Sequence, residues 1–293
     1  MYELRRFLLG IFMVLVLIEI WVFLNISKFS SRLIRVKSLN NIKPKQLRPL
    51  DYFKGRVSGE PWAKAGDVKT RYIGALEWVM NRSGAVGPEE TDDPVELLKS
   101  VEAGGCSNCT GMAILYQNTL AAVGLPSRTV RLQRNIRDFY DAHVTVEVLI
   151  DGKWVIMDPS FNVTFENPEG ELLSAQEIKT LFFKGLHDRV KPVFHGEVKY
   201  PARLEKYYID YLPLFNNIFV LDNQKSNSLS KIPPFRYWFG PRAYYEKIPN
   251  ESVQHLDFTQ KMMYFLIGLI PLAIIFIVIL LIMFTIPHVI SQD

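Results

Sequence analysis

The sequence predicts an α+β domain, with a helix packed on an antiparallel sheet, between two membrane-spanning helices. Three observations predict this architecture. Long apolar stretches lie near both ends of the 293-residue chain. A helix-like spacing of apolar residues follows Cys109. Two segments of alternating apolar and polar residues flank Asp151-Gly152, a pair typical of tight β-hairpin turns.

The two apolar stretches cover residues 7–26 and 262–286. Each has the length of about 20 residues that a helix needs to cross the hydrocarbon core of a membrane. A cleavable signal peptide is the alternative for the first stretch, because Arg5-Arg6 precedes it. No small-residue cleavage motif follows it, which favours a retained helix.

The chain is expected to have seven parts, in which one globular domain lies between the two membrane helices. In chain order they are an N-terminal tail (1–6), a transmembrane helix (7–26), a basic juxtamembrane linker (27–60), the folded domain (61–200), an extension rich in aromatic residues and proline (201–261), a transmembrane helix (262–286) and a C-terminal tail (287–293).

The charged residues argue against nucleic acid as a partner. The chain has 34 lysine and arginine residues against 30 aspartate and glutamate residues, a net charge of +4. Nucleic-acid-binding domains usually concentrate basic residues in a patch or stripe. The lipid bilayer is the partner that the apolar stretches imply.

Inside the domain, apolar spacing predicts helices over residues 70–81 and 94–103 and a largely buried helix that begins at Cys109. Gly124 and Pro126 end this last helix. A strand is expected over residues 127–132, and Ser174 begins a further helix with the pattern of a capping box.

The hairpin around Asp151-Gly152 has a register that can be worked out. A two-residue loop places Ile150 opposite Lys153, and continuing outward places Thr145 opposite Asp158. His143 and Asp158 are then diagonal neighbours on one face of the hairpin, within reach of each other. The alternating valines on the other face predict a half-buried strand over residues 143–150.

Cys109, His143 and Asp158 form the candidate catalytic group. The positive end of a helix dipole favours a thiolate at Cys109, and the thiolate is the nucleophilic form of cysteine. A His–Asp pair supplies the base and the orienting group that such a nucleophile needs. The spacing of the residues leaves open whether Cys109 approaches the hairpin.

The segments GGCSNCTGMAILYQNTLAAVGLPSRTV and DAHVTVEVLIDGKWVIMDPSFN resemble the transglutaminase-like superfamily, a papain-related group of Cys-His-Asp enzymes. The resemblance covers roughly residues 65–165, and its motifs match in order and spacing. The matching positions are Cys109, Ala113, Val123 to Arg128, His143-Val144, Glu147-Val148, Trp154 and Asp158-Pro159.

The resemblance implies a papain-like core and a role for each residue of the group. Cys109 would be the nucleophile, His143 the general base and then acid, and Asp158 the orienting carboxylate. The backbone N–H of Cys109 is the expected first oxyanion donor, and Trp78 and Asn108 are candidates for the second. Neither a cofactor nor a metal is implied.

Cys106 is the competing nucleophile, and the family spacing favours Cys109. The nucleophile of the family lies four residues before the helix alanine and about nineteen before the arginine that follows the helix. Cys109 has these distances to Ala113 and Arg128. The Cys-x-x-Cys pair has three other possible interpretations. They are a redox dithiol, a zinc site and an optional disulfide that blocks the nucleophile.

Two functions of different class follow. The first is a membrane-anchored thiol acyl-transfer enzyme that acts on amide bonds of a protein or peptide. Hydrolysis is expected rather than crosslinking, because the sequence has no acidic calcium-binding loop. The second is a non-catalytic membrane module whose cleft binds a peptide or polymer of the cell envelope. In both cases the partner is expected to be associated with the membrane or envelope.

The expected location is a bacterial cell membrane, crossed twice, with the catalytic domain in the cytoplasm. Lysine and arginine residues mark the cytoplasmic side of a membrane helix. The domain side of the two stretches carries more of them than the outer flanks do. Against this, long domains translocate largely regardless of charge, so an extracytoplasmic domain is the alternative.

Overall fold

The computed structural model describes the greater part of the domain and scattered residues of the two terminal stretches. The described residues are 6–7, 10–11, 13–14, 16–17, 20, 33–43, 46–82, 87, 91–136, 141–196, 211–222, 242–245, 262 and 277–278. The chain divides into two compact units, one of residues 1–35, 225–242 and 249–293 and the other of residues 36–224 and 243–248.

An eight-stranded sheet forms the centre of the fold, in the order β1-β8-β7-β2-β3-β4-β5-β6. The pairings from β8 through β6 are all antiparallel, so the predicted α+β class with an antiparallel sheet is confirmed for these strands. The strands are β1 (Leu33–Val36), β2 (Ser127–Gln133), β3 (Ala142–Ile150), β4 (Lys153–Asp158), β5 (Val163–Glu166), β6 (Lys191–Phe194), β7 (Asn217–Leu221) and β8 (Arg242–Tyr245).

The β3–β4 hairpin has the predicted register, with Ile150 opposite Lys153 and Val146 opposite Met157. Asp151 and Gly152 both have positive φ angles, 49° and 81°. Two positive φ angles are what a two-residue type I′ turn requires, and this turn matches the twist of the strands. The local sequence therefore determines which residues of β4 lie beside β3.

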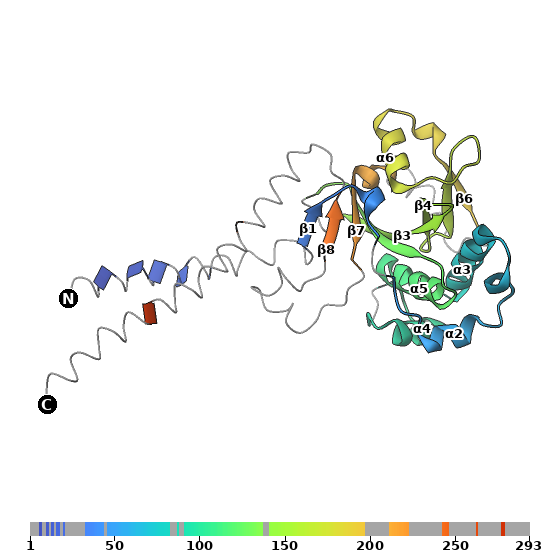
Figure 1. Cartoon of the computed structure of the whole chain (residues 1–293), viewed down its shortest axis with the longest axis horizontal. Coiled ribbons are helices and arrows are strands. Elements are labelled where there is room, and N and C mark those ends of the chain that lie inside the picture. Colours follow the sequence, from blue (N-terminus) through green and yellow to red (C-terminus); the bar gives the residue numbers. More distant parts are fainter. Residues whose placement is uncertain are drawn as a thin grey trace. The chain divides into compact units, whose positions relative to one another are not determined.

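Helices α2 to α5 cover one face of the sheet, as Figure 1 shows below β3. Buried residues of all four helices form one core cluster with the inward side chains of β3 and β4, among them Val146 and Met157. The helices are α2 (Asp51–Val57), α3 (Val68–Arg82), α4 (Pro94–Glu102), α5 (Cys109–Ala122) and α6 (Ala175–Phe183). Short 3₁₀ helices are η1 (Leu39–Asn41), η2 (Pro61–Lys64), η3 (His187–Arg189) and η4 (Leu212–Asn216).

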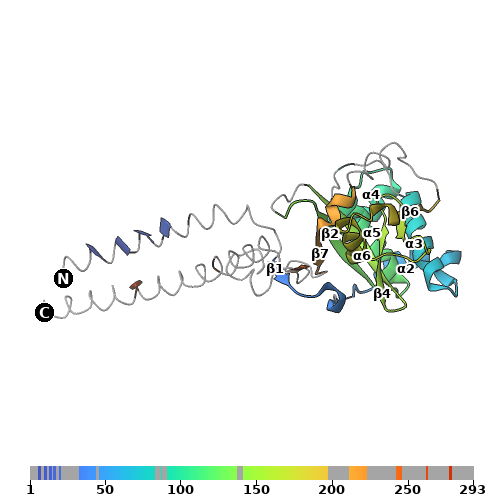
Figure 2. The ribbon, with the colours of Figure 1, turned by 90° about the horizontal axis from the view of Figure 1, so that it is seen from above.

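The opposite face of the sheet is covered as well. Ile178 of α6 and Phe215 of η4 pack there in a second core cluster, and Figure 2 shows α6 over the strands when the molecule is viewed from above. Ser174 and Glu177 form the predicted capping box at the start of α6. The half-buried strand predicted for residues 143–150 is therefore wrong. Thr145 and Glu147 are as buried as Val146 and Val148, because the second cluster covers their face.

Two segments expected to lie outside the domain contribute to its core. Phe53 and Val57 of α2, in the range predicted as a linker, are buried in the first cluster. Strand β7, in the range predicted as an extension, lies between β2 and β8. The aromatic residues of the extension that the structure describes thus pack on the core.

The predicted membrane helices lie for the most part outside the described residues. Those residues of 7–26 that are described are helical, and most of their large apolar side chains are exposed. Near the other end, Met262 and Val278 are exposed and Ile277 is buried. Among the described residues, no helix is both long and apolar enough to cross a membrane. The two spans and the domain boundaries stay predictions.

Candidate active site

Cys109 occupies the first turn of α5, where its side chain is partly exposed. Asn108 caps this helix, because its side-chain oxygen accepts hydrogen bonds from the backbone N–H groups of Thr110 (2.8 Å) and Gly111 (3.2 Å). Most of the following residues of the helix are buried, among them Met112 and Leu115. The cap and the buried helix together fix the thiol at the positive end of the helix dipole.

His143 and Asp158 form a buried pair where β3 begins and β4 ends. His143 Nε2 lies 2.7 Å from Asp158 Oδ2, and the two residues are 2% and 0% exposed. The other carboxylate oxygen accepts the backbone N–H of Ser160 at 2.9 Å. The hairpin thus places these two side chains on one face and in contact, as its register predicts.

Cys109 meets this pair through the imidazole ring. The Cys109 thiol and His143 share a side-chain hydrogen bond. Since Asp158 holds Nε2, the other ring nitrogen, Nδ1, is the one that faces the sulfur. The backbone N–H of Val144 also donates to Cys109. Helix α5 and strand β3 therefore bring together three residues that local spacing alone could not join.

The surroundings of the group favour transfer of a proton from Cys109 to His143. Burial raises the pKa of the Cys109 thiol, but the hydrogen bond and the charge of His143, with the Val144 N–H, outweigh burial and lower this pKa overall. Burial lowers the pKa of His143, but the charge and the hydrogen bond of Asp158 outweigh it and, with Cys109, raise the pKa to about 10. These shifts favour a thiolate–imidazolium pair.

Two further residues next to the group were not predicted from the sequence. Arg131 of β2 lies opposite Val144 in the sheet, and its charge interacts with that of Cys109. Tyr211, directly before η4, donates its hydroxyl to Asp158 Oδ2. Tyr211 follows Asp158 by 53 residues, and no motif links the two. The only signal in the sequence was the high aromatic content of its segment.

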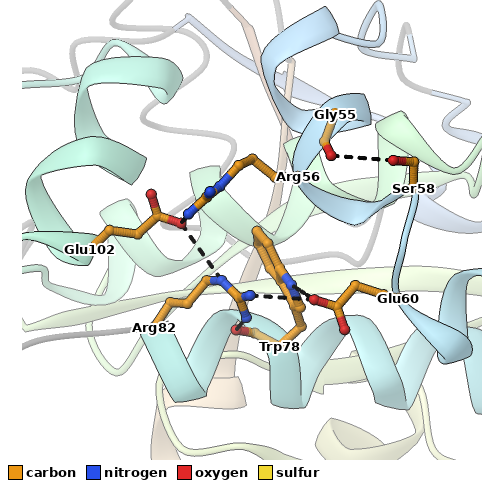
Figure 3. A network of polar contacts seen from close by, with 7 residues as sticks. All are labelled: Gly55, Arg56, Ser58, Glu60, Trp78, Arg82 and Glu102. Carbon is orange, nitrogen blue, oxygen red and sulfur yellow. Dashed lines mark hydrogen bonds and ion pairs between the residues drawn. The ribbon is translucent and has the colours of Figure 1, made fainter.

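Trp78 uses its indole N–H in another contact, and its oxyanion role stays a prediction. Its indole N–H donates to Glu60 Oε1 at 2.8 Å. Figure 3 shows this bond within a network in which Arg82 lies between Glu60 and Glu102. The Arg82 guanidinium also stacks on the Trp78 ring, 3.9 Å from its centroid. The indole is thus held in a polar network of α3, with its N–H already used.

Asn108 lies next to the nucleophile, but its side-chain oxygen serves as the helix cap. An oxyanion donor would have to be its amide nitrogen, and this role stays a prediction. The Cys109 backbone N–H lies in the first turn of α5, where an N–H group has no partner within the helix. It stays the expected first donor.

The arrangement has the parts that acyl transfer through a thiol requires. They are a nucleophile whose thiolate is favoured, a base in contact with it, a buried carboxylate that orients the base, and a helix N-terminus at which an oxyanion can be stabilised. The catalytic roles of the three residues stay predictions, whereas their mutual placement is a feature of the structure.

Comparison with known proteins gives a match in the same region. Residues 65–159, which include Cys109, His143 and Asp158, match the family model of the transglutaminase-like superfamily. A solved structure of a candidate cysteine protease from Cytophaga hutchinsonii is similar to the chain at 18% sequence identity, with a TM-score of 0.30. That similarity covers 38% of this chain and 39% of that chain. No match was found among curated proteins.

The family match confirms the resemblance inferred from the motifs, for the segment over which it extends. It begins three residues before α3 and ends one residue after β4. It therefore includes the helices and the hairpin that carry the three residues, and it leaves out α2, α6, η4, β7 and β8. This segment of the chain is similar to the transglutaminase-like superfamily.

Proposed function

We propose that the protein is a membrane-anchored thiol acyl-transfer enzyme that hydrolyses amide bonds of a protein or peptide. The observation that carries the proposal is the continuous contact from Cys109 through His143 to Asp158 at the start of a buried helix. The match of this segment to the transglutaminase-like superfamily supports it. If these three residues served only to pack the core, they would not need to contact one another in the order Cys109, His143, Asp158.

In the proposed reaction, His143 takes the proton of the Cys109 thiol, and the thiolate attacks the carbonyl carbon of the amide. The C=O π electrons move to oxygen, where the Cys109 N–H stabilises the negative charge. The intermediate collapses, the C–N bond breaks, and His143 gives its proton to the departing amine. A thioester remains. Water, deprotonated by His143, attacks it and releases a carboxylic acid and the free thiol.

Asp158 acts on the ring rather than on the substrate. Its contact with Nε2 fixes the orientation in which Nδ1 faces the sulfur. Its charge stabilises the imidazolium that forms when the thiolate does. The group therefore contains its own proton acceptor and the charge that stabilises the protonated form.

The first prediction concerns alkylation by iodoacetamide at pH 6. Cys109 in a Cys106→Ser chain should react at least about 10-fold faster than Cys106 in a Cys109→Ser chain, because the lowered pKa of Cys109 increases the fraction of thiolate. Adding His143→Ala should abolish this advantage, since it removes the imidazolium. Mass spectrometry of the modified peptide measures both rates.

The matched control replaces His187, which is exposed in η3, with alanine. It should leave the alkylation rate of Cys109 within about twofold of the parent. A rate for Cys109 that rises in a single step near pH 8.5, as for an ordinary cysteine, would show an unactivated thiol. The chain would then be better described as a binding module, and the proposed chemistry would be wrong.

We also propose that the chain is anchored in the cell membrane with its domain in the cytoplasm and a membrane-associated protein or peptide as substrate. The exposed apolar side chains along the described helical residues of 7–26 support the anchor. The excess of lysine and arginine on the domain side of both stretches supports the orientation.

The second prediction tests anchor and side together. With both native cysteines replaced by serine, Asp92→Cys introduces a single thiol at an exposed position before α4. The chain should stay with membranes after extraction at alkaline pH. A membrane-impermeant maleimide should modify Cys at position 92 only after cell lysis. Release by alkali would contradict the anchor, and modification in intact cells would place the domain outside.

A further inference from the structure

Tyr211 contacts the same carboxylate oxygen as the proposed base. Its hydroxyl donates to Asp158 Oδ2 at 2.5 Å, and His143 Nε2 lies 2.7 Å from that oxygen. The Ser160 N–H holds the other oxygen at 2.9 Å. Asp158 is thus fixed by three donors, of which one comes from its own loop, one is the catalytic ring and one comes from a segment far along the chain.

The ring of Tyr211 also contacts the imidazole directly. The two rings meet edge to face, with centroids 5.1 Å apart and planes at 68°. Behind it, Phe165 of β5 stacks on Tyr211 at 5.9 Å and 3°, and Phe215 of η4 packs against it at 5.5 Å and 76°. Tyr211 is 2% exposed. Aromatic neighbours therefore hold the tyrosine in place beside His143.

We propose that Tyr211 is a positioning residue, which fixes the Asp158 carboxylate so that His143 presents Nδ1 to Cys109. The inference rests on the proposed function and adds a residue to it. Tyr211 lies outside the segment that matches the transglutaminase-like superfamily, which ends at residue 159. The candidate site thus includes a part of the chain that neither the motifs nor the family match contains.

The Tyr211 hydroxyl limits the rotation of the Asp158 carboxylate. A carboxylate held by one backbone N–H can still turn about its Cβ–Cγ bond and move Oδ2 away from the ring. A hydroxyl bound to Oδ2 from a rigid aromatic cluster opposes that rotation, because any turn breaks a buried hydrogen bond to a charged group. Among the described residues, the titratable or charged groups that contact or act on the ring include Cys109, Asp158 and the Tyr211 hydroxyl, and the Arg131 charge acts on Cys109.

The alternative is that Tyr211 serves only to fill space beside His143. Tyr211→Phe separates the two, because it keeps the ring and its packing and removes only the hydroxyl. Tyr245→Phe is the matched control. Tyr245 is a buried tyrosine of β8 whose hydroxyl donates to Asn217 Oδ1 at 3.0 Å, in the same sheet but not at the candidate site.

The third prediction uses the full-length chain in the Cys106→Ser background, with fluorescently labelled casein as the substrate and iodoacetamide as the probe of Cys109. Tyr211→Phe should lower kcat about 10- to 100-fold, the range expected for the loss of one hydrogen bond to a charged group. KM should stay within about twofold, since Tyr211 does not touch the substrate. Tyr245→Phe should keep the parent kcat.

The pH profile of alkylation supplies a readout that packing would not change. With the ring less firmly oriented, the pH at which Cys109 becomes reactive should move upward in Tyr211→Phe, toward that of an ordinary thiol. An unchanged or lowered midpoint would contradict positioning. The same substitution in an Asp158→Ala chain should shift the midpoint no further, because the residue through which Tyr211 acts is gone. A full additional shift there would also contradict it.

The outcome of this experiment is distinct from that of the proposed function. If the parent chain shows neither rapid alkylation at pH 6 nor hydrolysis, the proposed function fails and Tyr211 has no reaction to assist. If the parent is active and Tyr211→Phe matches it in kcat and in pH midpoint, the function stands and the positioning role is overturned.

Discussion

Asp158→Asn should lower the rate of amide hydrolysis by about 10⁴-fold, the cost of the corresponding change in a serine-protease triad. Asp158 accepts hydrogen bonds from Tyr211, from Ser160 and from His143. Asparagine has one acceptor oxygen and an N–H₂ group in place of the other. Its N–H₂ group would therefore face a group that itself donates a hydrogen bond. It also removes the charge that stabilises the His143 imidazolium.

The measurement is the release of peptides from fluorescently labelled casein, with Cys109→Ala as the background. The control is Asp141→Asn, which changes an exposed carboxylate directly before β3 that pairs with Arg134 at 2.9 Å. This variant should hydrolyse casein within about twofold of the parent. A loss of less than tenfold in Asp158→Asn would mean that the carboxylate contributes to packing and not to the reaction.

The largest expected effect on stability comes from Glu147→Leu. Glu147 Oε2 pairs with Arg128 at 2.6 Å, and its other oxygen accepts the Ala175 N–H at 2.9 Å. Both side chains of the pair are almost fully buried. The substitution removes the carboxylate that neutralises the Arg128 charge and the acceptor of the Ala175 N–H, and Arg128 keeps only its bonds to the carbonyls of η1 and Ile42. Removing one partner of a buried pair costs about 3–5 kcal/mol. Thermal unfolding followed by tryptophan fluorescence should show a Tm lower by roughly 10 °C.

Two further variants separate this effect from a general loss of charge. Glu169→Leu removes one partner of the exposed pair Arg189–Glu169. It should change the Tm little, because such pairs contribute about 0–1 kcal/mol. Arg128→Met combined with Glu147→Leu should be less destabilised than the sum of the two single variants. Additive losses in the double variant would show that the two residues do not act as a pair.

The sequence predicts those parts of the fold that depend on neighbours in the chain. The β3–β4 register follows from Asp151-Gly152, and the start of α6 follows from Ser174 and Glu177, because turns and caps are decided within a few residues. The burial of α2 and the insertion of β7 beside β2 are decided by packing over long distances. The apolar residues of these segments do not indicate which part of the chain they pack against.

The same division holds within the candidate site. His143 and Asp158 could be placed together because one hairpin carries both. The contact of Cys109 with them requires α5 to pack on β3, which the family resemblance implied and the spacing did not. Trp78 was a candidate by analogy, but Glu60 is its partner in the structure. Tyr211 could not be found, since nothing in its segment indicates that it folds back onto Asp158.

The position of β7 has a consequence for how the chain is made. Asn217 of β7 bonds to Gln133 of β2 across 84 residues of sequence. A growing chain therefore contains Cys109, His143 and Asp158 well before the strand that covers the edge of β2 has left the ribosome. Until then that edge is open to pairing with other chains. A fragment cut to the limits of the family match would keep the open edge permanently, so an expression fragment needs residues 36–224 together with 243–248, the compact unit that includes β7 and Tyr211.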